Sequence, residues 1–129
     1  MASELRLTTL ANNAGTESVD TTYVINGSAK LWTSFANTSG TPSALQSLNQ
    51  SSITDSGSGH YGINTTNAFT NNEYSAQCTS SAEQSYGGVA VVDLGNMTSS
   101  QLRFYTCENN ASAVNDFDRN NAQAHGDLA

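Results

Sequence analysis

The side chains that could carry covalent chemistry in this chain are its two histidines and two cysteines: His60, His125, Cys78 and Cys107. A histidine beside a thiol can accept its proton and so activate the sulfur as a nucleophile. The local sequences match neither the G-x-S-x-G turn nor the surroundings of a papain-like cysteine. His60 lies in a glycine-rich stretch and His125 in the polar tail, and both positions are typical of solvated histidines. The pattern therefore favours no catalytic centre here.

Aspartates are the second group that could do chemistry. Asp116 and Asp118 have the spacing that opens a calcium-binding loop, and Asp127 stands at its twelfth position. Asn121 replaces the glycine that such a loop requires, and Asp127 replaces its bidentate glutamate. An ordinary acidic loop is the favoured interpretation. A small hydrolase or depolymerase that uses Asp116 and Asp118 as paired acids is the alternative from a different functional class.

The cysteines have two structural interpretations. Small buried apolar groups are favoured, and a disulfide between Cys78 and Cys107 is the alternative. The N-terminal sequence lacks the apolar stretch of an export signal, which weighs against the disulfide and leads us to expect folding in a cytoplasm. A zinc site needs three or four clustered ligands, and none is visible. We expect no metal and no cofactor.

The composition describes a domain with little apolar material. Leu, Ile, Val and Phe make up 22 of 129 residues, while Ser and Thr number 33 and Asn 15. A partly disordered chain fits these numbers, but the apolar residues are clustered, which favours a thin β-core that gains burial by oligomerising. The net charge is −7 with four scattered Lys and Arg, which argues against nucleic acid. No apolar run approaches the roughly 18 residues that insertion into a membrane requires.

Alternating apolar and polar residues predict short strands. We expect them near residues 29–38, 47–54, 60–64, 74–78, 89–94, 101–107 and 121–129. The stretch 89–94 is apolar on both faces, which predicts a central strand, whereas the polar tail predicts an edge strand. The fold class is therefore all-β, a single antiparallel β-sandwich or small barrel of about seven or eight short strands.

One strand places the single tryptophan apart from the core. In residues 29–38, Leu31 and Phe35 share one face while Trp32 lies on the other. Trp32 is therefore expected to cover a second layer or to lie in a subunit interface.

Tyrosine with abundant Asn and Ser is typical of adaptable binding surfaces. The tyrosines are Tyr23, Tyr61, Tyr74, Tyr86 and Tyr105. The alternative is that most of them complete the thin core. Glycosylation sequons begin at Asn26, Asn37, Asn49, Asn64, Asn96 and Asn110. We attribute the sequons to the Asn, Ser and Thr content rather than to modification.

The run SSITDSGSGHYGINTTNAFTNNEYSA at residues 51–76 resembles a β-domain found near the C-termini of tail-fibre and related virion proteins of tailed bacteriophages. The matching pattern consists of Ser52-Ile53-Thr54-Asp55, Gly57, Gly59, Tyr61, Thr66, Ala68, Phe69, Asn71 or Asn72, and Tyr74. The stretches GSAKLW at 27–32, QLRFY at 101–105 and GDLA at 126–129 also resemble parts of that domain. SELRLTTL at 3–10 resembles the opening of such virion proteins.

The resemblance implies a homotrimer without enzymatic activity that is located in the virion. Residues 1–24 would be an N-terminal attachment arm that contacts other virion proteins, and residues 25–129 the β-sandwich domain. The chain has no shaft between the two, so a short tail fibre or head fibre that contacts host-surface glycan is expected, with a capsid cement or decoration protein as the alternative. The candidate trimer or core aromatics are Trp32, Phe35, Tyr61, Phe69, Tyr74 and Phe104.

Overall fold

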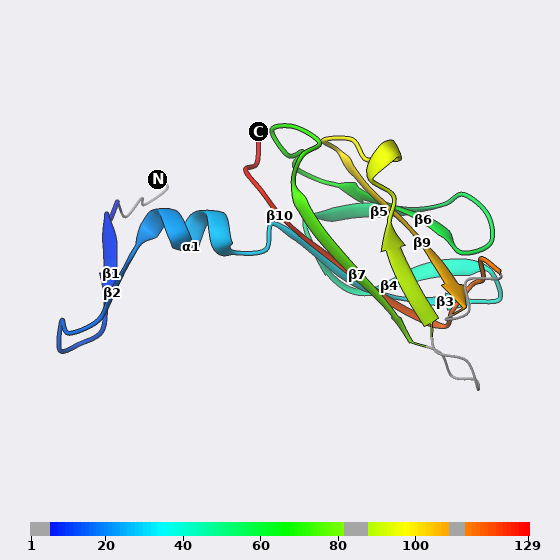
Figure 1. The fold of residues 1–129 in the computed structure, drawn as a ribbon, viewed down its shortest axis with the longest axis horizontal. Coiled ribbons are helices and arrows are strands. Elements are labelled where there is room, and N and C mark those ends of the chain that lie inside the picture. The colour runs from blue at the N-terminus through cyan, green and yellow to red at the C-terminus, as the bar shows by residue number, and fades with distance from the viewer. Residues whose placement is uncertain (1–5, 82–87, 109–112) are drawn as a thin grey trace.

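The computed structural model describes residues 6–81, 88–108 and 113–129 (Figure 1). Tyr86, the sequon at Asn110 and residues 1–5 of the expected arm lie outside this part. In chain order the described elements are β1 (Thr9–Ala11), β2 (Ser18–Asp20), α1 (Thr21–Gly27), β3 (Leu31–Thr38), β4 (Thr41–Leu48), β5 (Gln50–Asp55), β6 (His60–Thr65), β7 (Ser75–Ser81), β8 (Gly88–Val92), the short 3-10 helix η1 (Leu94–Asn96), β9 (Gln101–Glu108) and β10 (Arg119–His125).

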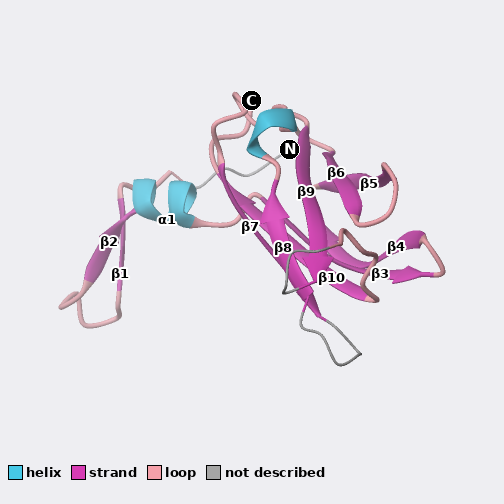
Figure 2. Cartoon of the chain, turned by 45° about the vertical axis from the view of Figure 1, so that its right-hand side comes forward, coloured by secondary structure: helices cyan, strands magenta, loops and turns pink. Residues whose placement is uncertain are grey.

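Two four-stranded antiparallel sheets pack face to face, which confirms the predicted antiparallel β-sandwich (Figure 2). The front sheet has the order β4-β3-β10-β7, and the back sheet has the order β5-β6-β9-β8. Among the described residues no helix is long and apolar enough to cross a membrane.

The core lies between the sheets and follows the period of two along each strand. The front sheet contributes Leu31, Phe35, Ala122 and Ala124, and the back sheet contributes Tyr61, Ile63, Leu102 and Phe104. The ring of Phe35 meets the ring of Tyr61 edge to face with 5.1 Å between centroids. Aromatic pairs in this geometry gain attraction beyond their buried area. A few rings therefore supply much of the packing in a chain with few large aliphatic residues.

A single residue moves the chain from one sheet to the other. The sequence pattern predicted one strand over residues 47–54, but β4 ends at Leu48 and β5 begins at Gln50. Asn49 between them has φ +59, a left-handed conformation that asparagine tolerates better than most residues. Its side chain exchanges two hydrogen bonds with the backbone of Asn67, at 3.0 and 2.7 Å. The predicted strand is therefore wrong at this corner.

The positions of two predicted strands within their sheets are also corrected. β8 is an edge strand of the back sheet, not a central one, and Val89 on its outer side is 40% exposed. β10 is not an edge strand, because it pairs with β3 on one side and β7 on the other. Its inward residues are mostly small, including Ala122 and Ala124, and these give a weak apolar pattern. Apolar side-chain size was therefore a poor guide to strand position.

The N-terminal hairpin and helix lie to one side of the sandwich (Figures 1 and 2). β1 pairs with β2, and α1 follows directly. Thr21 ties the start of the helix to the hairpin, because its backbone N–H and its hydroxyl both donate to the carbonyl of Thr8. We call residues 6–28 the arm. It includes all of α1, whereas the sequence predicts a boundary at residue 24.

Candidate functional site

Five of the six candidate aromatics lie inside a single copy of the chain. Phe35, Tyr61 and Phe104 form one group of rings, with centroid distances from 5.1 to 6.2 Å. The rings of Phe69 and Tyr74 stack with 4.0 Å between centroids. They lie at the end of the sandwich where Phe69 forms a β-bridge with Leu128. All five are buried. They build the core of the sandwich, and only Trp32 of the six remains at the surface.

Tyr61 is the centre of a polar network at one end of this core. Its hydroxyl donates to Oδ1 of Asp116 at 2.8 Å and accepts from the side-chain amide of Asn37 at 2.6 Å. The backbone N–H of Gly59 donates to the same Asp116 oxygen at 2.6 Å. Burial, followed by the hydrogen bond and charge of Asp116, raises the pKa of Tyr61 above its ordinary value. The phenol therefore stays protonated and serves as a structural cross-link.

The network gives Asp116 a structural role. One oxygen of Asp116 holds the turn at Gly59 and the ring of Tyr61, and the backbone carbonyl of Asp118 accepts from Asn37. The calcium alternative also required residues 116–127 to coil around an ion, but Arg119–His125 is the extended strand β10. The described residues contain no group of three or more His, Cys, Asp and Glu placed to hold a metal.

The cysteines lie in different sheets as free thiols, Cys78 in β7 and Cys107 in β9, so the disulfide alternative is not formed. Burial raises the pKa of the Cys78 thiol to about 11, which keeps it protonated at neutral pH and a poor nucleophile. His60 lies against the ring of Tyr105 with 5.9 Å between centroids. Nδ1 of His125 lies 3.0 Å from the carbonyl oxygen of Gly27, at the junction of arm and sandwich.

The arm carries uncovered apolar side chains. Those exposed by two fifths or more are Leu7, Leu10, Val19, Tyr23, Val24 and Ile25. Tyr23 is 75% exposed, and α1 buries none of its residues. A seven-residue helix and a three-residue strand pair are each marginal in isolation. The arm thus holds six of the thirteen large apolar residues that are exposed in the described chain.

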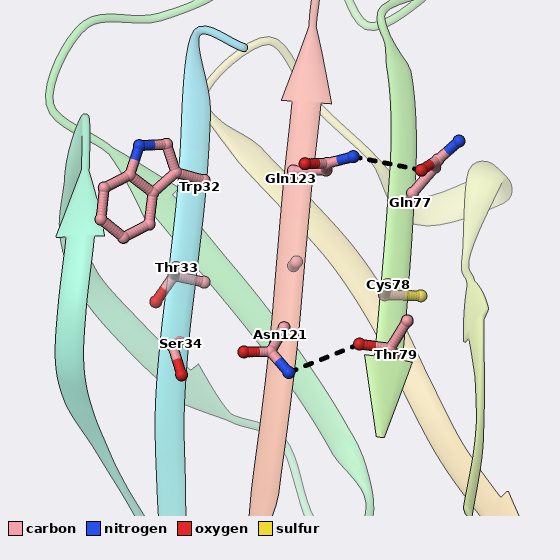
Figure 3. Close-up of a pocket in the computed structure, with 9 residues that line it drawn as sticks. Trp32, Thr33, Ser34, Gln77, Cys78, Thr79, Asn121 and Gln123 are labelled. Carbon is pink, nitrogen blue, oxygen red and sulfur yellow. Dashed lines mark hydrogen bonds between the residues drawn. The ribbon is translucent and has the colours of Figure 1, made fainter. Parts of the chain in front are cut away.

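The outer face of the front sheet brings Trp32 together with a set of amide side chains. The strand register places Gln123 of β10 between Trp32 of β3 and Gln77 of β7. In the next row of the same face, Asn121 lies between Ser34 and Thr79. Nε2 of Gln123 donates to Oε1 of Gln77 at 3.1 Å, and Nδ2 of Asn121 donates to the hydroxyl of Thr79 at 3.4 Å (Figure 3).

These two rows border an open cavity of about 400 Å³. The nine residues that line it carry no formal charge (Figure 3). Trp32 is 38% exposed at the β4 side of this surface, next to Leu48 in the register. In Figure 3 the indole extends toward β4, while the amides lie across β3 on β10 and β7, so the surface carries an aromatic ring on one side and neutral hydrogen-bonding groups on the other. We call it the Trp32 face.

The sequence pointed to Trp32 but missed its partners. Gln77, Asn121 and Gln123 look like ordinary solvated strand residues, because their distance in sequence hides their neighbourhood in the sheet. The signal that was present is the alternation in residues 119–125, where polar residues alternate with Ala122 and Ala124. Placing β10 between β3 and β7 is what brings the amides beside Trp32.

Comparison with protein-family models, curated proteins and solved structures gives no match for this chain. The resemblance to tail-fibre β-domains therefore stays a prediction from the sequence. What is established is the architecture: an antiparallel β-sandwich with a projecting arm and an uncharged cavity beside Trp32.

Proposed function

We propose that this chain is a non-enzymatic structural protein of a tailed-phage particle, a short tail fibre or head fibre. The arm fixes the protein to the particle, and the sandwich faces outward toward the host surface. The observation that supports this best is the arm itself, whose apolar side chains lie outside the sandwich core. Exposed apolar patches of this kind are typical of protein interaction sites.

The stability of the arm supports the same proposal. Its helix is capped by Asp20, whose side chain accepts from the N–H of Thr22 at 2.7 Å, so the short helix has a defined start. A cap contributes only about 1 kcal/mol, which does not replace the burial that the helix lacks. A partner surface that covers the side of α1 centred on Val24, with Tyr23 and Ile25 on its two flanks, would supply that burial. In the proposal this partner is another protein of the particle.

The resemblance adds a homotrimer to the proposal. Three sandwiches around one axis would gain burial that a single thin core lacks. Size-exclusion chromatography with light scattering on the purified chain measures this directly. A trimer is expected, and a well-folded monomer at high concentration would count against it.

The attachment role is tested by replacing exposed apolar residues of the arm and, as a control, of the sandwich. The double variant Tyr23→Ser with Ile25→Ser removes apolar surface from the arm. Leu94→Ser is the matched control, because Leu94 is 74% exposed but lies in η1 on the sandwich. Particles assembled with each variant are purified and their content of the protein is measured. The arm variant should be depleted at least severalfold while the control is incorporated normally, and equal incorporation would contradict the proposal.

Capsid cement is the alternative within the same class. It uses the same arm, but the sandwich would then contact neighbouring capsid subunits. A density map of the assembled particle distinguishes the two: a sandwich that projects freely supports the fibre, and one that bridges capsomers supports the cement.

A further inference from the structure

We infer that the Trp32 face is a binding site for a neutral saccharide, with Trp32 stacking on a sugar ring and the amide rows bonding its hydroxyl groups. The inference deepens the proposed function, because it gives the outward-facing sandwich a ligand and a location for it. It concerns the sandwich alone and does not depend on what the arm contacts.

The tryptophan supplies the first half of such a site. Trp32 alternates with the buried residues Leu31 and Thr33, so its ring is held on the outer side of β3. An indole presents a flat apolar face with one N–H donor, and one side of a pyranose ring presents a matching row of C–H groups. Leu48 is next to Trp32 in the register and extends the apolar surface on which such a ring would lie.

The amides supply the second half. Each of these hydrogen bonds engages one polar group of an amide side chain and leaves its other polar group available. Oε1 of Gln123 and Nε2 of Gln77 remain after the first bond, and Oδ1 of Asn121 remains after the second. In Figure 3 the free oxygens of Gln123 and Asn121 point toward the β3 side, where Trp32 lies. Free acceptors and donors side by side suit hydroxyl groups, since each hydroxyl both donates and accepts.

The spacing of the rows fits a ring-sized ligand. Gln123 and Asn121 are two positions apart on β10, which separates the rows by about 7 Å. A cavity of about 400 Å³ lies at the small end of the range for ligand pockets and has room for one or two sugar rings.

The charge distribution selects a neutral ligand. None of the cavity residues is charged, and the nearest cation along β10, Arg119, stands in the following row between Ala36 and Ser81. The chain as a whole carries a net charge of −7, which disfavours sialylated or sulfated glycans. Hexoses and N-acetylhexosamines are the sugars that this surface fits.

The position within the sheet favours a saccharide over a peptide. Peptides that bind sheets commonly add a strand at an exposed edge. The Trp32 face is centred on β3 and β10, which are both paired on two sides. Paired strands hold the side chains in place before binding, so little ordering is needed when the ligand arrives.

The test uses the full chain and two measurements. An array of immobilised neutral, sialylated and sulfated oligosaccharides identifies binders, and the best neutral oligosaccharide is then titrated against the fluorescence of Trp32, the only tryptophan. We expect neutral glycans to bind and to change the emission. On the array, Trp32→Ala should weaken binding at least tenfold, with Trp32→Phe between it and the parent. Gln123→Ala and Gln77→Ala should each weaken binding severalfold.

Tyr105→Ala is the matched control, since Tyr105 is an aromatic residue on the outer face of the other sheet. It should bind as the parent does. Three results would overturn the inference: no binding by the parent chain, unchanged binding by Trp32→Ala, or preference for anionic glycans. Loss of the oligomer in Trp32→Ala without any glycan binding by the parent would assign the face to contacts between copies instead. Failure here leaves the incorporation of the arm variants into particles unaffected, so the two proposals fail separately.

Discussion

The hydroxyl of Tyr61 donates a 2.8 Å hydrogen bond to Asp116, across 55 positions of sequence. The bond links β6 of the back sheet to the segment that leads into β10 of the front sheet. Asn37 of the front sheet completes the link by donating to the same hydroxyl. One phenol thus joins both layers of the sandwich, and the acidic segment that resembled a metal loop in sequence is a structural connection.

Tyr61→Phe should destabilise the sandwich by about 1–3 kcal/mol, because it leaves the buried side-chain amide of Asn37 without an acceptor and removes one of the donors to the exposed Asp116. Tyr105→Phe makes the same chemical change on an outer face and should alter stability by less than about 0.5 kcal/mol. Urea unfolding followed by Trp32 fluorescence measures both. Equal stabilities of the two variants would show that the network adds nothing.

Gly59→Ala should destabilise the sandwich severely, by about 3–5 kcal/mol. Gly59 has φ +67, and an added Cβ would lie 2.7 Å from the carbonyl oxygens of Thr106 and Asn115. Gly57 in the same turn also has positive φ, but no atom lies within 4 Å of its Cβ position. Gly57→Ala should therefore cost only the backbone strain, about 1–2 kcal/mol. Thermal unfolding of the pair provides the comparison, and similar losses would contradict the crowding at Gly59.

Asn49→Ala should cost about 1–2 kcal/mol, since it removes both hydrogen bonds to Asn67 and forces alanine into a left-handed conformation. Asn49→Gly loses the same bonds but adopts φ +59 freely, so it should be the milder change. Denaturant unfolding of both variants separates the two contributions. A glycine variant as unstable as the alanine variant would assign the whole effect to the hydrogen bonds.

Alkaline pH should destabilise the folded chain, over a pH range set by the raised pKa values of Tyr74 and Cys78. Burial raises the pKa of Tyr74 to about 12, whereas an unfolded tyrosine ionises near pH 10. The folded state therefore keeps the proton longer, and its stability advantage is complete below pH 10 and is lost as the pH rises toward 12. Cys78 acts in the same direction from about pH 9 to 11.

The unfolding free energy measured across this alkaline range should fall with pH. The unfolding free energy of Tyr74→Phe should fall less steeply above pH 10. That of Cys78→Ala should fall less steeply between about pH 9 and 11. A parent chain whose stability is flat over this range would contradict the burial of both groups.

Removal of residues 1–28 should leave the unfolding midpoint of the sandwich within about 2 °C of the parent, because the buried core contains no arm residue. The truncation loses the contacts of His125 to Gly27 and of Lys30 to Ile25 and Ser28, which are all exposed and contribute little. Differential scanning calorimetry measures the midpoint. A large drop would mean that the arm is part of the cooperative unit.

The sequence predicted the fold class, most strand locations and the inward residues Leu31 and Phe35 of β3, because this strand alternates large apolar side chains with polar ones. The prediction failed where the local sequence pattern does not reveal which strands lie next to each other or where the backbone turns. The strand order that places β10 in the centre depends on long-range pairing, and the corner at Asn49 depends on one backbone torsion. The alternation in β3 sets Trp32 apart from the core, but its amide neighbours come from strands more than 40 residues away in sequence.

The central place of β10 has a consequence for biosynthesis. β3 and β7 leave the ribosome long before the strand that joins them, so the front sheet stays split into β3–β4 and β7 until Arg119–His125 is available. Closing such distant pairs is slow, and both inner edges are open meanwhile. During that interval the nascent chain presents two unpaired strands to its neighbours, so crowded synthesis at high copy number is when this protein is most prone to exchange strands between copies.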